Sequence, residues 1–181
     1  MQVHGHIALG NPSTPQLRND FFSRCSYDIG GQEWTLDYIE HVALRANSCK
    51  AFAKTPLLPA SDSRLKLAMP SVDCRVHFAL NCGAKSCPPI RLYEPDKLDE
   101  QLHLAARAFV EDESNLLLAP RLIKLSKIFF WYSPDFAADE AGMLRRLGDF
   151  LSKDKKALLE GIMSAEYKVE YFDYDWEENR V

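Results

Sequence analysis

Cysteine and histidine side chains are concentrated in one short segment of the chain. Residues 74–89 hold three of the five cysteines and one histidine: Cys74, His77, Cys82 and Cys87. A cysteine thiolate is a strong nucleophile and a metal ligand, and an imidazole serves as a base or as a ligand. The sequence therefore predicts chemistry in this segment, and three interpretations of it are open.

The first interpretation is a nucleophilic cysteine. Cys82 follows an apolar run and precedes Gly83, which would place its sulfur at the exposed end of a strand. His77 is the first candidate base, because a catalytic thiol needs a base or positive surroundings to lower its pKa. Cys87 is the alternative nucleophile, and His41 is the alternative base.

The second interpretation is a structural zinc site with Cys74, His77, Cys82 and Cys87 as its ligands. Their two-four-four spacing is that of a zinc knuckle in which the inner cysteine and histidine are exchanged. Tetrahedral sites of three cysteines and one histidine are common. Against zinc, a strand over residues 75–80 would point Cys74 and His77 to opposite faces. A chain of 181 residues also buries enough core to fold without a metal.

The third interpretation is structural. Buried cysteines pack like small apolar residues, and a histidine in an apolar strand is usually a hydrogen-bonded core residue. Asn81 and Gly83 would then serve only a tight turn. A disulfide or redox pair of Cys82 and Cys87 is a variant, although their four intervening residues differ from the Cys-x-x-Cys spacing of thioredoxin-like enzymes.

A second pair of polar residues lies earlier in the chain. His41 and Arg45 are one turn apart on a helix predicted over about residues 36–47. Both could face a cleft, where Arg45 would hold an anion, and the alternative is a solvated surface pair.

The elements that position these residues follow from periodicity and turn chemistry. Gly30-Gly31 predicts a hairpin over residues 26–35, and Pro95 predicts the first turn of a helix. The other predicted elements are strands over residues 75–80, 116–118, 122–125 and 167–172, and helices over about 137–151 and 153–163. These interspersed elements predict an α+β fold with a small, mainly antiparallel sheet and several packed helices, in a single domain over residues 1–181.

Composition excludes several classes of protein. The 22 basic and 26 acidic residues leave a net charge of −4, which argues against a nucleic-acid-binding surface. The sequence has no stretch of about 20 apolar residues, so we predict no membrane insertion. The five cysteines are an odd number and no secretory signal precedes them, so we expect a soluble, cytoplasmic protein with reduced thiols. No nucleotide-binding loop occurs, and we predict no cofactor.

Residues 76–89, Val-His-Phe-Ala-Leu-Asn-Cys-Gly-Ala-Lys-Ser-Cys-Pro-Pro, resemble the signature of the domain of unknown function 547 family. The resemblance runs from about residue 20 to 176 and includes residues 39–45, 98–102, 125–129 and 174–176. The family has no established substrate or reaction.

The resemblance implies a functional surface at the polar positions that match: His41, Arg45, His77, Asn81, Cys82, Ser86 and Cys87. We expect Arg45, Asn81 and Ser86 to bind a substrate or an anion. Cys74 stands where members commonly have a proline, which lowers the support for zinc. Members usually begin with a further helix, so we expect residues 1–20 to be a truncated N-terminal helix and a loop.

The leading prediction is a thiol-dependent, enzyme-like site in the loop of Cys82 and Cys87, with hydrolase or transferase chemistry if it is catalytic. The ligand would be an unidentified small molecule or a protein. The first alternative is a non-catalytic protein-interaction module in which the cysteines and histidines are structural. The second alternative is the zinc site.

Overall fold

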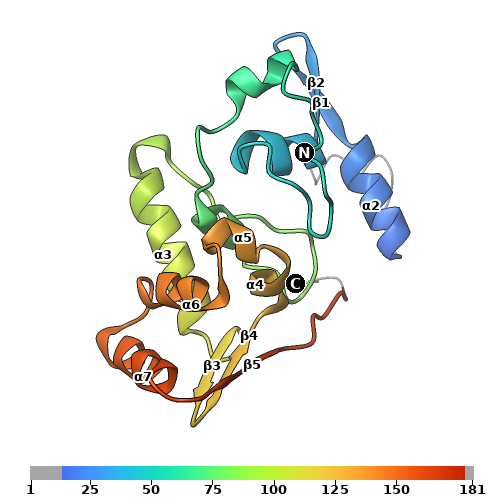
Figure 1. Cartoon of the computed structure of the whole chain (residues 1–181). Helices are drawn as coiled ribbons and strands as arrows, with labels where there is room; N and C mark the ends of the chain where they lie inside the picture. Colours follow the sequence, from blue (N-terminus) through green and yellow to red (C-terminus); the bar gives the residue numbers. More distant parts are fainter. Residues whose placement is uncertain (1–13, 178–181) are drawn as a thin grey trace. The chain divides into compact units, whose positions relative to one another are not determined.

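The computed structural model describes residues 14–177, and Figure 1 shows their course. Contacts within the chain divide it into two compact units, Met1–Asp73 and Cys74–Val181, which we describe separately. A single domain over residues 1–181 stays a prediction. Residues 1–13, where we expected the truncated helix to begin, lie outside the described residues.

The first unit contains a helix that the sequence analysis did not predict. Helix α2 spans Pro15–Arg24 and overlaps the end of residues 1–20, which we expected to be a truncated helix and a loop. The Thr14 hydroxyl accepts a hydrogen bond from the Leu17 backbone N–H at 3.2 Å, so Thr14 caps the helix. Proline is favoured at a first helical position because its missing N–H would have no helical partner.

The predicted hairpin is confirmed. Strands β1 (Ser26–Ile29) and β2 (Gln32–Thr35) pair antiparallel around Gly30 and Gly31. The two glycines have φ angles of 64° and 78°, which a two-residue hairpin turn requires and which glycine adopts without strain.

The helix expected over residues 36–47 is shorter and wider than predicted. Tyr38–Leu44 forms a π-helix, and Val42 on it packs with Trp34 and Leu58 in a small hydrophobic core. The turn Ser63–Leu67 is a 3₁₀-helix. π-Helices are rare and often occur at functional sites.

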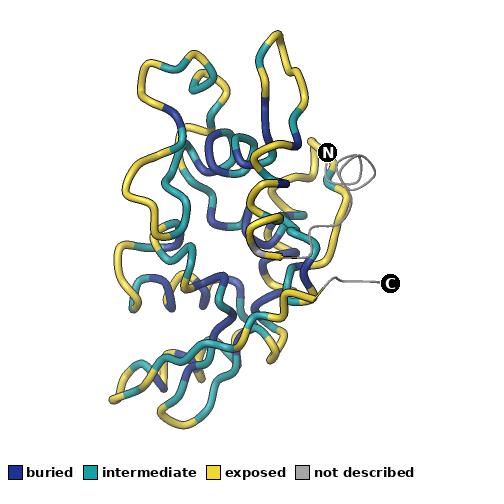
Figure 2. Tube along the Cα trace, turned by 90° about the vertical axis from the view of Figure 1, so that its right-hand side faces the viewer, coloured by how far each residue is buried: buried dark blue, intermediate teal, exposed yellow. Residues whose placement is uncertain are grey.

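The second unit is built on a three-stranded sheet and the helices around it. Strands β3 (Leu116–Ala119) and β4 (Leu122–Leu125) are antiparallel, whereas β5 (Lys168–Tyr171) pairs parallel to β4. The helices of this unit are a 3₁₀ turn Pro95–Lys97, α3 (Leu98–Glu111), α4 (Lys127–Trp131), α5 (Ser133–Phe136), α6 (Glu140–Gly148) and α7 (Lys153–Met163). Buried residues recur at helical spacing on α3, and Figure 2 shows buried and exposed residues following one another along the chain. The α+β fold class with a small, mainly antiparallel sheet is confirmed.

The strand predicted over residues 75–80 is wrong. Cys74–Phe78 is a 3₁₀-helix, and Phe78 is fully buried against the rings of Phe109, Phe129 and Phe136. A short apolar run is compatible with either a buried strand or a buried helical turn. Packing in the aromatic core of this unit, and not the local sequence, therefore determines that the segment is a helical turn instead of a strand.

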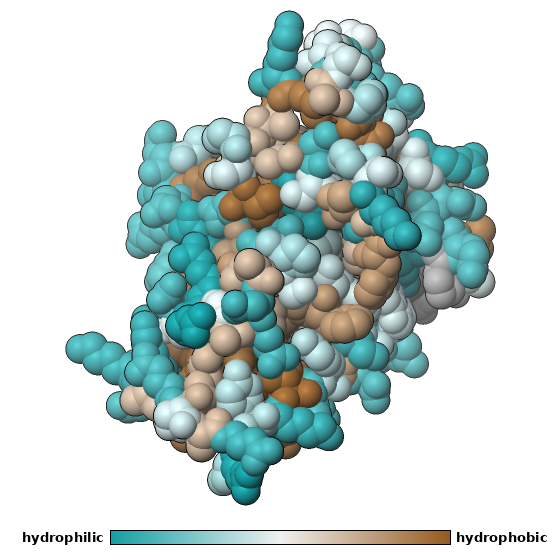
Figure 3. All heavy atoms as spheres, in the orientation of Figure 1, coloured by the Kyte–Doolittle hydropathy of each residue, from teal (hydrophilic) through white to brown (hydrophobic). Residues whose placement is uncertain are grey.

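Within residues 14–177, no helix is both long and apolar enough to cross a membrane. Hydrophilic side chains cover most of the face drawn in Figure 3, with hydrophobic residues exposed between them.

Candidate functional site

The two candidate nucleophiles lie in one loop whose ends are joined by a single side chain. The Asn81 amide donates a hydrogen bond to the Pro88 carbonyl at 2.7 Å and accepts one from the Gly83 N–H at 2.6 Å. Inside the loop, the Cys87 N–H donates to the Ala84 carbonyl at 3.0 Å. Gly83 has a φ of 86°, a conformation that favours glycine. We call residues 81–88 the dithiol loop.

The fold of the dithiol loop brings its two sulfurs into contact. The Sγ atoms of Cys82 and Cys87 lie 3.0 Å apart, and the Cys82 N–H donates to the Cys87 Sγ at 3.1 Å. Both residues are half-buried. Cys87 thus accepts hydrogen bonds from both the backbone and the side chain of Cys82.

A third donor reaches the same sulfur from the end of the chain. The Tyr174 hydroxyl lies 3.2 Å from the Cys87 Sγ and 3.8 Å from the Cys82 Sγ. Its ring packs against Trp131 and Trp176, at centroid distances of 4.8 and 4.6 Å, and the two tryptophan rings lie 5.5 Å from each other. Burial, and then the nearby thiol charges, raise the pKa of Tyr174, so its hydroxyl keeps its proton and donates it in a hydrogen bond.

These contacts separate the pKa values of the two thiols. The hydrogen bond from Cys82 contributes most to lowering the pKa of Cys87 to about 6, and Tyr174 and backbone N–H groups add to it against the effect of burial. The same hydrogen bond, followed by burial, raises the pKa of Cys82. The first proton therefore leaves Cys87. This order favours Cys87, our alternative nucleophile, over Cys82.

Backbone pairing holds the C-terminal segment against the dithiol loop. The Lys85 N–H donates to the Glu177 carbonyl at 2.9 Å, and the Ser86 N–H donates to the Asp175 carbonyl at 3.3 Å. The Asp175 N–H in turn donates to the Ser86 hydroxyl at 2.9 Å, and Lys85 forms an ion pair with Glu177. Ser86, which we expected to bind a substrate or an anion, thus helps to hold the segment that carries Tyr174.

His77, our first candidate base, has the surroundings of a core residue. Its Nε2 lies 2.7 Å from the Asp135 carboxylate, and the two side chains are 2% and 4% exposed. The ring stacks on Tyr132 at 4.1 Å and on Phe136 at 5.7 Å. This environment favours the structural interpretation of His77.

His41 and Arg45 contact each other inside the first unit. The Arg45 Nη1 donates to the His41 Nδ1 at 2.6 Å and to the Cys49 carbonyl at 3.1 Å. A guanidinium has no acceptor, so the His41 Nδ1 must be unprotonated and the ring proton sits on Nε2. Asp37 and Glu40 lie 3.9 and 3.7 Å from that Nε2. His41 and Arg45 are both buried, so the alternative of a solvated surface pair is wrong.

The four residues considered as zinc ligands do not form one cluster. Among residues 14–177, no three His, Cys, Asp or Glu side chains are arranged to hold a metal ion. Cys82 and Cys87 lie together, whereas His77 contacts Asp135. Cys74 is buried in the hydrophobic core of the second unit.

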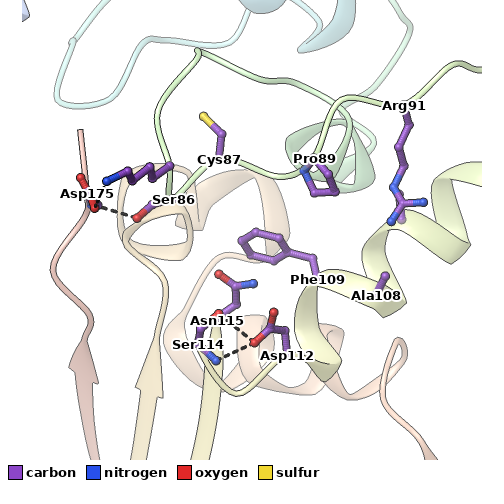
Figure 4. Close-up of a pocket in the computed structure, with 12 residues that line it drawn as sticks. Ser86, Cys87, Pro89, Arg91, Ala108, Phe109, Asp112, Ser114, Asn115 and Asp175 are labelled. Carbon is purple, nitrogen blue, oxygen red and sulfur yellow. Dashed lines mark hydrogen bonds and ion pairs between the residues drawn. The ribbon is translucent and has the colours of Figure 1, made fainter. Parts of the chain in front are cut away.

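A cavity of about 480 Å³ lies beside the dithiol loop (Figure 4). Its wall combines residues of the loop and of α3, and its charged side chains are Lys85, Arg91, Asp112 and Asp175. Cys87 is one of the residues that line this cavity, and in Figure 4 its sulfur is directed away from Phe109.

Tyr174 and Asp135 are the site residues that the sequence analysis missed. Tyr174 lies 87 residues from Cys87, and Asp135 lies 58 residues from His77. The Tyr174-Asp175-Trp176 motif in the family resemblance was a signal for the first, and no local signal marked the second.

The fold and this loop define an α+β protein with a half-buried pair of interacting thiols. A model of the family described as protein of unknown function, DUF547, matches residues 1–110, and the chain belongs to this family. The match includes the dithiol loop, while residues 125–129 and 174–176 lie beyond it. No curated protein and no solved structure matches the chain.

Proposed function

We propose that this protein carries a thiol-dependent active site in which the Cys87 thiolate is the nucleophile. One observation carries the proposal: three donors converge on the Cys87 sulfur, from the Cys82 thiol at 3.0 Å, the Cys82 N–H at 3.1 Å and the Tyr174 hydroxyl at 3.2 Å. Donors that face a sulfur stabilise its anionic form.

This assignment removes the need for a histidine base. A thiol with a pKa of about 6 is mostly ionised at neutral pH, so Cys87 requires no neighbour to take its proton. The buried contact of His77 with Asp135 supports a structural role for that pair. The proposed site therefore differs from a Cys/His hydrolase or transferase, in which a histidine activates the thiol.

Reduced thiols are a condition of this chemistry. We therefore propose a cytoplasmic location, where the cellular thiol pool keeps Cys82 and Cys87 reduced. The substrate is an electrophilic small molecule or a protein group that reaches a half-buried sulfur.

The test is the pH dependence of alkylation of each cysteine in the native protein, measured with iodoacetamide and peptide mass spectrometry. Cys87 should react fastest, with an apparent pKa near 6 instead of the free-thiol value of about 8.5. Cys25 is an internal control, because burial raises its pKa. A Cys87 that reacts no faster than Cys25, or that titrates at the free-thiol value, contradicts the proposal.

The non-catalytic interaction module is the second candidate, and one surface observation favours it. Ile90 and Leu92 follow the dithiol loop and are 79% and 93% exposed. Exposed apolar side chains are common singly, but neighbouring ones suit contact with a protein. If the alkylation test fails, this segment is the place to look for a partner.

A further inference from the structure

We infer that the dithiol loop is a redox unit that exchanges with disulfides, in which Cys87 attacks the substrate disulfide and Cys82 resolves the mixed disulfide. This inference rests on the proposed nucleophilic role of Cys87 and adds a substrate class to it. It is carried by the contact of the two sulfurs and by the hydrogen bonds that hold the loop around them.

The geometry requires little movement to join the sulfurs. The Sγ atoms are 3.0 Å apart, and a disulfide bond is about 2.04 Å long, so they must approach by about 1 Å. Asn81 joins the two ends of the loop through its hydrogen bond to Pro88, and the hydrogen bond from the Gly83 N–H orients the Asn81 amide. The second thiol is therefore already beside the sulfur that it must attack, and such proximity accelerates an intramolecular step.

The exchange balances in two steps. In the first, the Cys87 thiolate attacks one sulfur of a substrate disulfide, forms a mixed disulfide with that half and releases the other half as a thiolate. In the second, Cys82 gives its proton to the released thiolate and attacks the Cys87 sulfur, which releases the remaining half as a thiolate. The pair is oxidised by two electrons to a Cys82–Cys87 disulfide, and the substrate disulfide is reduced to one thiol and one thiolate, which takes its proton from water.

The hydrogen bonds assign the order of attack. Cys87 accepts the three donors and is the thiol that ionises first. The pKa of Cys82 is raised chiefly by its hydrogen bond to Cys87, and that cause disappears when Cys87 becomes part of a mixed disulfide. Cys82 thus becomes a better nucleophile at the step where it is needed.

The aromatic residues around Tyr174 supply a reporter for this exchange. Trp131 and Trp176 pack against the ring whose hydroxyl contacts both sulfurs. Oxidation of the pair alters these contacts and should change the tryptophan fluorescence of this cluster.

The experiment uses the reduced full chain, oxidised glutathione as the probe disulfide, and intact-mass and peptide mass spectrometry at neutral pH. The wild-type protein should lose the mass of two hydrogens, form a Cys82–Cys87 disulfide and release two glutathione thiols. The Cys82→Ser variant should stop after one release, with one glutathione on Cys87. The Cys87→Ser variant should lose the rapid reaction, and Cys49→Ser should behave as wild type.

Two results would overturn the inference. One is a wild-type protein in which glutathione stays on Cys87 without resolution, and the other is a disulfide that joins a different pair. If Cys87 nevertheless alkylates with a pKa near 6, the proposed nucleophile stands and only the disulfide-exchange role fails. If Cys87 shows no such reactivity, the proposed function itself fails.

Discussion

Replacing Tyr174 by phenylalanine should move the ionisation of Cys87 to higher pH. The substitution removes the hydroxyl that lies 3.2 Å from the Cys87 sulfur and keeps the ring that packs on Trp131 and Trp176. A hydrogen bond to a charged group contributes about 1.5–3 kcal/mol, and we take the lower end because Cys87 is half-buried.

That free energy sets the size of the effect. One pKa unit corresponds to about 1.4 kcal/mol, so the pKa of Cys87 should rise by about one unit. The thiolate is the form present above the pKa, so the ionised fraction at pH 6 should fall from about one half to about one tenth. Alkylation of Cys87 at pH 6 should therefore slow about fivefold, and the two rates should converge where both proteins are fully ionised.

The assay is the pH–rate profile of Cys87 alkylation in wild type and Tyr174→Phe. Tyr171→Phe is the matched control, because it makes the same change on a ring that packs on Phe130. An unchanged profile in Tyr174→Phe, or an equal shift in Tyr171→Phe, would refute the role of the Tyr174 hydroxyl.

Two further substitutions test the surroundings of the thiols. Asp135→Asn should lower the free energy of unfolding in urea by about 1–3 kcal/mol, because a buried hydrogen bond to His77 is weakened, while the exposed control Asp154→Asn should have little effect. The pH profile of Cys87 alkylation in Asp135→Asn should stay as in wild type. A shifted profile would show that His77 affects the ionisation of Cys87. Asn81→Ala should slow Cys82–Cys87 disulfide formation several-fold, because the hydrogen bond to Pro88 that closes the loop and the one from Gly83 are lost. Wild-type kinetics in this variant would contradict a role of Asn81 in holding the sulfurs together.

Local patterns were sufficient for the elements whose signals are strong over a few residues. Gly30-Gly31 predicted the hairpin because its turn demands positive φ angles, and the strands near residues 116–125 and 167–172 were also confirmed. Helix α2 was missed, although Thr14 and Pro15 are an N-cap and first-turn pair, because we interpreted the preceding Gly and Pro residues as a loop.

The candidate site was only partly predictable, because its decisive contacts join distant parts of the sequence. The dithiol loop itself was identified from the cysteine spacing. Part of the lowering of the Cys87 pKa depends on Tyr174, 87 residues from Cys87, and the role of His77 depends on Asp135, 58 residues away. The 3₁₀-helix at Cys74–Phe78 likewise depends on aromatic rings contributed by later helices.

The central claim is that Cys87 is ionised at neutral pH, and a difference titration tests it most directly. The ultraviolet absorbance of the thiolate would be followed with pH in the reduced wild-type protein and in the Cys82→Ser/Cys87→Ser double variant, and the second curve subtracted from the first. A first ionisation with a pKa near 6 is the result we predict. An ionisation at or above the free-thiol value of about 8.5 would contradict it, because the three donors at the Cys87 sulfur would then not stabilise its anion.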